Sequence, residues 1–169
     1  EKTRSKEVKW TLLIADDGSN DGTLDYLDNI RFEDVSTIIL KNKRLGIAGQ
    51  TNSIIDQLME REFDVCFCCN DDILFTKNGW DFLYRDVLKR TGYDHLCYFD
   101  RSWNLKNNLP EPLIKGQLFN SCLPENIQGC FFTLTPEVIR NIGYFDTVNF
   151  GFRGLAHVDF TWRCCRAGF

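Results

Sequence analysis

The sequence predicts an α/β domain with a mainly parallel central sheet that helices cover on both faces. Short apolar runs typical of buried strands alternate with segments whose apolar residues recur at helical spacing. This alternation favours parallel strands joined by crossover helices. Two of the apolar runs end directly in acidic clusters, and open α/β sheets bind ligands at the carboxyl ends of their strands. The length of 169 residues suits a single domain over residues 1–169.

The expected strands and helices follow one another in a regular order. Ser19 is expected to cap the first helix and Asn78 the third, because short polar side chains accept hydrogen bonds from free helical N–H groups. Thr135 precedes Pro136, and a proline at the first helical position favours a further helix there. The expected strands are 10–15, 35–40, 63–69, 96–99 and 128–134, and the expected helices between them are 21–29, 47–59 and 79–89.

The most informative feature is the acidic cluster Asn70-Asp71-Asp72, which directly follows the apolar run 63–69. Carboxylate and amide oxygens are hard ligands that suit Mg²⁺ or Mn²⁺. A divalent cation held there could bridge phosphate oxygens and neutralise the charge that develops on a departing diphosphate. Asparagine and aspartate are also common in solvated turns, so the cluster alone leaves both interpretations open.

A second acidic turn, Asp16-Asp17-Gly18-Ser19, follows the first expected strand. Strand-end carboxylates can accept hydrogen bonds from a base or ribose, and the N–H groups at the start of a helix favour anions, so this turn suits a nucleotide. Two acidic strand ends in one predicted sheet are a stronger signal than either alone. We expect the strands ending at Ala15, Leu40 and Cys69 to be neighbours, so that Asp17 and Asp72 face one crevice.

Six short motifs follow in a characteristic order and spacing. They are 13–23, Asn42 with Gly46 and Asn52, 70–72, 129–132, 143–146, and 158–163 with Gly168. With these motifs the chain, from about residue 10 to residue 169, resembles the GT-A nucleotide-sugar glycosyltransferases of the large inverting family two. The resemblance implies a GT-A-like fold and inverting transfer of a sugar from a nucleotide diphosphate donor, with a UDP-sugar as the expected donor. It also implies a Mn²⁺ or Mg²⁺ cofactor and a carbohydrate or other hydroxyl acceptor.

The resemblance assigns expected roles to individual residues. Asp17 would hold the base or ribose, and Asp72, together with Asp71, would hold the cation. Asp146 would either order the loop before the active site or act directly, and Arg163 is expected to pair with a carboxylate. The irregular segment 100–127 is expected to shape the acceptor site. The expected donor-binding residues are Asp16, Asp17, Ser19, Arg44, Gly46 and Asp71.

The chain departs from the family pattern at two places. Members normally begin with a strand, a donor-binding loop and a helix, whereas here only residues 1–9 precede the first strand. The expected fold therefore lacks the first β-α unit. Where the family carries a Glu-Asp pair whose Asp is the general base, this sequence has Ala156-His157. His157 could be the base or a metal ligand, and Asp159 is a second candidate base.

Two other functions fit parts of the pattern. A sugar-phosphate nucleotidyltransferase also combines acidic metal ligands with a nucleotide-binding α/β fold. Such enzymes typically carry a Gly-rich basic loop at the first strand, and this sequence has none. A truncated or degenerate domain could instead bind a nucleotide-sugar without activity, or support a larger assembly.

Composition narrows the classes further. The eight cysteines form no C-x-x-C pair and only two histidines are present, so neither a zinc site nor a disulfide framework is expected. Free thiols suit a reducing, cytoplasmic compartment. The net charge of −4, without a basic stripe, argues against nucleic acid as a partner. No run is long enough to span a bilayer, while peripheral association with the cytoplasmic face of a membrane stays open. The sequence leaves the oligomeric state unspecified.

Overall fold

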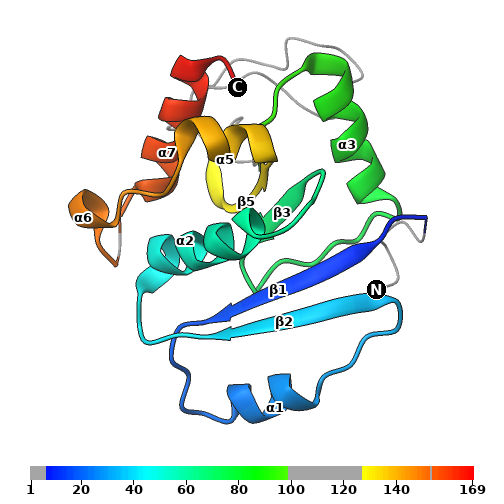
Figure 1. The fold of residues 1–169 in the computed structure, drawn as a ribbon, viewed down its shortest axis with the longest axis vertical. Coiled ribbons are helices and arrows are strands. Elements are labelled where there is room, and N and C mark those ends of the chain that lie inside the picture. The colour runs from blue at the N-terminus through cyan, green and yellow to red at the C-terminus, as the bar shows by residue number, and fades with distance from the viewer. Residues whose placement is uncertain (1–6, 99–126, 153) are drawn as a thin grey trace.

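The structure is a computed structural model that describes residues 7–98, 127–152 and 154–169 (Figure 1). Apart from Ile127, the segment 100–127 that was expected to shape the acceptor site lies outside the described residues. The described elements are β1 (Trp10–Asp16), α1 (Thr23–Asn29), β2 (Val35–Lys41), α2 (Gly46–Met59), β3 (Cys66–Cys69), α3 (Trp80–Thr91), β4 (Cys97–Tyr98), β5 (Gln128–Leu134), α5 (Pro136–Ile142), α6 (Thr147–Phe150) and α7 (Ala156–Ala167).

The first two strands form the parallel pair that the sequence predicts. Trp10 pairs with Val35 and Asp16 with Lys41. α1 connects the strands, as a parallel pair requires. The fold is mixed α/β with a parallel sheet and several helices, which confirms the predicted class.

The third strand does not pair with the first two, so this part of the prediction is wrong. In the described part of the chain, β3 pairs with β5, and β5 also pairs with β4, in a separate antiparallel sheet. Cys66 lies opposite Leu134 and Cys69 opposite Phe131. An apolar run indicates burial but does not specify a pairing partner, which is why the sequence could not exclude this arrangement.

Aromatic rings connect the two sheets. Trp10 at the start of β1 stacks on Phe67 of β3 with ring centroids 6.0 Å apart, and it lies equally close to Trp80 of α3. Phe131 of β5 contacts Phe67, with a centroid distance of 6.2 Å. Such pairs contribute beyond the apolar area they bury. This aromatic cluster fixes β1 beside β3 without a hydrogen-bonded ladder in the described residues.

The main core lies around β5, between α2, α5 and α7. Ile55, Leu134, Val138, Phe160 and Cys164 are fully buried there. The ring of Phe160 stacks on that of Phe145 at 4.2 Å, so the loop before α6 is anchored in the same core. No helix within the described ranges is long and apolar enough to cross a membrane.

Two of the three expected helix starts differ in the structure. α1 begins only at Thr23, whose backbone N–H donates to the Asp21 carboxylate, while Ser19 takes part in the preceding turn. α3 begins after Gly79, and Asn78 does not cap it. The third expectation is confirmed: the Thr135 hydroxyl accepts from Val138 N at 3.3 Å. Sequence alone does not show how far a turn extends before a helix starts.

Candidate active site

Asp16 organises the first acidic turn. One of its carboxylate oxygens accepts hydrogen bonds from the backbone N–H groups of Gly18, at 3.0 Å, and Ser19, at 2.9 Å. A hydrogen bond from the Ser19 side chain, with help from the two backbone donors, holds the pKa of Asp16 below its usual value despite burial. Asp16 and Ser19 therefore shape this turn, and their expected contact with the donor stays a prediction.

Asp17 fastens the turn to the start of α2. Its Oδ1 accepts from Leu45 N at 2.6 Å, Gly46 N at 3.0 Å and the Gln50 side chain at 2.6 Å. Burial disfavours the ionised carboxylate, but these bonds and the charge of Arg44 outweigh burial and lower the pKa of Asp17. Oδ2 has one long bond, 3.3 Å from Gly46 N, so it is the oxygen better placed to receive a ligand.

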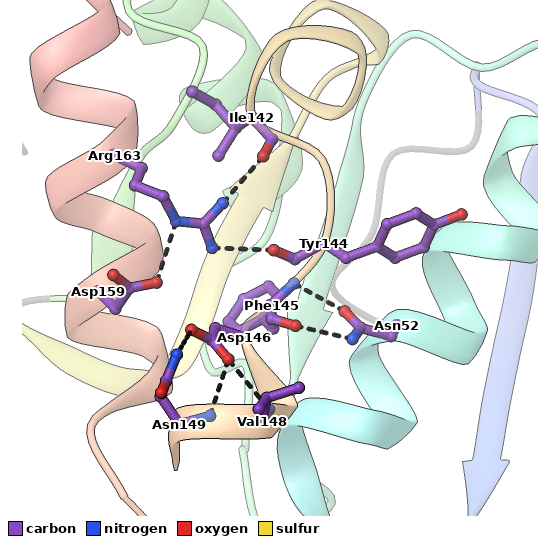
Figure 2. A network of polar contacts seen from close by, with 9 residues as sticks. All are labelled: Asn52, Ile142, Tyr144, Phe145, Asp146, Val148, Asn149, Asp159 and Arg163. Atoms are coloured by element: carbon purple, nitrogen blue, oxygen red, sulfur yellow. Dashed lines mark hydrogen bonds and ion pairs between the residues drawn. The ribbon is translucent and has the colours of Figure 1, made fainter. Parts of the chain in front are cut away.

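Polar side chains of α2 hold segments that are far apart in sequence. Gln50 donates to Asp17 and accepts from Asn42 at 2.7 Å. Asn52 exchanges two hydrogen bonds with the backbone of Phe145, at 2.9 and 2.8 Å (Figure 2). Sequence reasoning did not identify Gln50 as part of the site. In the structure its side chain is buried, where an amide without partners would be costly.

The second acidic cluster follows directly on the ladder between β3 and β5. Asn70 N donates to Cys130 O at 3.0 Å, which continues the strand register by one residue. Asp71 and Asp72 come next and are exposed. Burial raises the pKa of the Cys130 thiol, and the negative charge of Asp72 adds to this rise. These carboxylates are available to a ligand.

His157 lies against the same end of β5. Its imidazole packs on Gly129 so closely that a β-carbon built on this glycine would lie 2.6 Å from His157 Cγ. Gly129 precedes Cys130, whose carbonyl accepts from Asn70 N, so the ring lies close to the strand end that Asp71 and Asp72 follow. Partial burial lowers the pKa of His157. The structure therefore brings a neutral imidazole to the strand end that carries Asp71 and Asp72.

Asp159 is engaged with Arg163 one turn along α7. Its Oδ2 accepts from Arg163 Nε at 3.0 Å, as expected for that arginine (Figure 2). Arg163 also donates to the carbonyls of Ile142 and Tyr144, at 2.9 and 2.8 Å. Asp159 thus belongs to a network that supports the loop before α6, and its role as a base stays a prediction.

Asp146 caps α6 within the same loop. Its Oδ1 accepts from the backbone N–H groups of Val148, at 3.0 Å, and Asn149, at 2.9 Å (Figure 2). Hydrogen bonds from the Asn149 side chain and these N–H groups lower the pKa of Asp146. The geometry favours the first of the two expected roles of Asp146, which is to order this loop, over a direct role in the active site.

The segment from Phe152 to His157 reaches both acidic strand ends. Phe152 lies on Gly46, whose N–H is held by Asp17; a β-carbon on Gly46 would lie 2.8 Å from Phe152 Cα. His157 lies on Gly129, beside the second acidic cluster. Five residues of extended chain span at most about 18 Å, so the two contacts lie within that distance. The expected crevice between Asp17 and Asp72 stays a prediction.

The residues present fit a cation only in part. Among the described residues, no group of three or more His, Cys, Asp and Glu side chains is arranged to hold a metal ion. The cation that the sequence predicts at Asp72 and His157 therefore stays a prediction. Every cysteine in the described ranges is a free thiol.

Comparison with known proteins agrees with this architecture. The model of Glycosyl transferase family 2 matches residues 3–153, and the chain belongs to this family. The chain is also 29% identical, over 160 residues, to an uncharacterised glycosyltransferase, R363, of Acanthamoeba polyphaga mimivirus. That match covers 92% of this chain and 59% of the viral protein. The chain thus spans about three fifths of the length of this relative.

Proposed function

We propose that this chain is the catalytic domain of a glycosyltransferase that moves a sugar from a UDP-sugar to a carbohydrate or other hydroxyl acceptor with inversion. The observation that carries the proposal is the pair of contacts made by Phe152 and His157. Through them, one segment of chain touches the Asp17 turn and the strand end with Asp71 and Asp72. Family membership supplies the reaction class.

Each group has a stated task in this proposal. Asp17 Oδ2 accepts a hydrogen bond from the base or ribose, and the exposed Arg44 next to this turn contacts the diphosphate. Asp72, with Asp71, holds Mn²⁺ or Mg²⁺. The cation would neutralise charge on the departing diphosphate. The imidazole of His157 either accepts the proton of the acceptor hydroxyl at a free ring nitrogen or completes the cation's ligand set.

Calorimetric titration with UDP, with and without Mn²⁺, tests the proposal. Binding that requires Mn²⁺ is the expected result. The His157→Ala variant then separates the two tasks of the imidazole. As a metal ligand, its loss weakens Mn²⁺-dependent UDP binding together with turnover. As a base, its loss leaves UDP binding unchanged and lowers turnover by roughly 10²–10⁴-fold.

A second candidate is a domain that binds a nucleotide-sugar without catalysing transfer. The observation in its favour is that the described residues include no group of three metal-ligating side chains. This candidate would be favoured if UDP bound with the same affinity with and without Mn²⁺ and the full-length protein transferred no sugar. For the active form we propose a role in polysaccharide biosynthesis. We place it in the cytoplasm, because the free thiols of the described residues suit a reducing compartment.

A further inference from the structure

The backbone conformation of Gly129 does not require a glycine at this position. It occupies the second position of β5, and it is absent from the glycines whose φ is positive, so an L-residue could adopt its conformation. Glycine inside a strand is normally unfavourable because it adds no packing and loses more chain entropy than other residues. Some neighbouring group must therefore require the missing side chain.

That neighbour is the imidazole of His157. A β-carbon on Gly129 would lie 2.6 Å from His157 Cγ and 2.9 Å from both Cδ2 and Nδ1. All three nearest atoms belong to this ring, at distances that real β-carbons do not show. The ring belongs to the first turn of α7, and its shift would be constrained because Ala156 and Phe160 of the same helix are buried. An added methyl group would displace the imidazole.

The direction of this displacement matters for the acidic strand end. Asn70 N donates to the carbonyl of Cys130, the residue after Gly129, and Asp71 and Asp72 follow Asn70 in a turn. A ring lying on Gly129 is therefore close to the strand end from which the turn with Asp71 and Asp72 departs. A ring pushed off the strand would leave this neighbourhood.

We propose that Gly129 is a positioning residue, a platform without a side chain that holds the His157 imidazole beside Asp71 and Asp72. The consequence for donor binding rests on the proposed function. The packing relationship between Gly129 and His157 does not, so the two can fail separately.

A double-mutant cycle on thermal stability tests the packing relationship. Gly129→Ala should lower the Tm of the full chain by a few degrees. In the His157→Ala background the same change should cost nothing or raise the Tm slightly, because the clash is gone and alanine restricts the unfolded chain. An equal loss of Tm in both backgrounds, or no loss in either, would overturn the proposal.

Gly49→Ala provides the matched control. Gly49 also has no positive φ, and its β-carbon would lie 2.7 Å from Leu45 Cβ, far in sequence from His157. Its effect on the Tm should be the same with and without His157. A rescue of Gly49→Ala by His157→Ala would show that the histidine variant relaxes the whole domain, and this result would also overturn the proposal.

The second measurement is Mn²⁺-dependent UDP binding by calorimetry on the same four proteins. If His157 ligates the cation, Gly129→Ala should weaken binding by about 10–100-fold, the usual effect of removing support from a ligand. In the His157→Ala background, Gly129→Ala should then cause no further loss of affinity for UDP. Additive losses would show that Gly129 acts independently and would overturn the positioning role. If the wild-type protein binds no UDP, the proposed function fails while the Tm cycle still decides the packing relationship.

Discussion

Arg163 and Asp159 form an ion pair one turn apart on α7, with 3.0 Å between Nε and Oδ2 (Figure 2). The two remaining nitrogens of the guanidinium donate to the carbonyls of Ile142 and Tyr144, at the end of α5 and in the loop after it. The planar guanidinium suits such simultaneous bonds. This arginine therefore fixes the loop that carries Phe145 and Asp146 to the helix that carries His157.

Replacing Arg163 by alanine should destabilise the protein by about 2–4 kcal/mol, because three charge-assisted hydrogen bonds are lost. Arg140→Ala is the matched control. Arg140 forms an i,i+3 pair with Glu137 in which both side chains are more than half exposed, so its loss should cost about 0–1 kcal/mol. Urea denaturation of the two variants measures the difference. Similar losses would show that the Arg163 network is no stronger than a surface pair.

Asp17→Ala should cost about 1–2 kcal/mol, because Leu45 N and Gly46 N at the start of α2 lose their acceptor. The lowered pKa of Asp17 sets the pH dependence. The stabilisation is complete above the ordinary aspartate pKa of about 4 and is lost as pH falls through the lower folded value. Asp21→Ala, which removes an exposed turn carboxylate, is the control. Denaturation at pH 7 and pH 3 should show a smaller difference between wild type and Asp17→Ala at the acid end.

His95 should make the protein less stable in mild acid. Its Nδ1 donates to Thr133 O at 2.9 Å, and Nε2 lies 3.0 Å from the Thr161 hydroxyl. Burial lowers the pKa of His95 to about 4, while the unfolded chain titrates near 6.5. Between these values the unfolded state binds more protons, so stability falls as pH decreases from about 6.5 to 4, by about 3 kcal/mol.

The variant His95→Asn retains a donor toward Thr133 and should flatten this part of the stability profile. His157→Asn is the comparison, because it leaves His95 in place and should preserve most of the slope. Urea denaturation between pH 4 and pH 7 provides the data. An unchanged slope in His95→Asn would show that another group titrates.

Gly46→Ala should behave differently from Gly129→Ala. Gly46 has φ +71°, and its β-carbon would lie 2.8 Å from Phe152 Cα and 3.0 Å from Phe152 O. Phe152 Cδ1 is also 2.8 Å away, so Phe152→Ala should remove part of the clash. The two backbone atoms remain, and the loss should still exceed about 1 kcal/mol. Gly92→Ala, with φ +74° and open space around the glycine, isolates the cost of the backbone conformation. Full rescue by Phe152→Ala in thermal melts would show that the added β-carbon clashes only with the ring of Phe152.

The sequence predicted the elements well and their partners less well. Apolar periodicity located all five described strands, because burial leaves a pattern within a single segment. It could not show that β3 pairs with β5, since pairing depends on two segments far apart. The helix start at Pro136 was predictable because proline favours the first helical position, whereas the helix expected after Ser19 had no such marker.

In the candidate site too, features within one segment were predictable and contacts between distant segments were not. Both acidic clusters were visible because they directly follow apolar runs. The use of Asp17 as an anchor for α2 was not, because its partners Leu45 and Gly46 are distant in sequence. The contacts of Gly46 with Phe152 and of Gly129 with His157 could not be predicted either. The sequence shows a glycine but not which distant residue packs against it.

The pairing of β5 with both β3 and β4 has a consequence for the order in which the domain assembles. β1, α1, β2 and α2 follow one another along the chain, so the Asp17 anchor needs only nearby segments. The ladder between β3 and β5 must wait for β5, which comes much later in the chain. Contacts between segments far apart in sequence form slowly. On a ribosome, the turn proposed for the nucleotide would form first. The acidic strand end would take shape only once β5 has emerged.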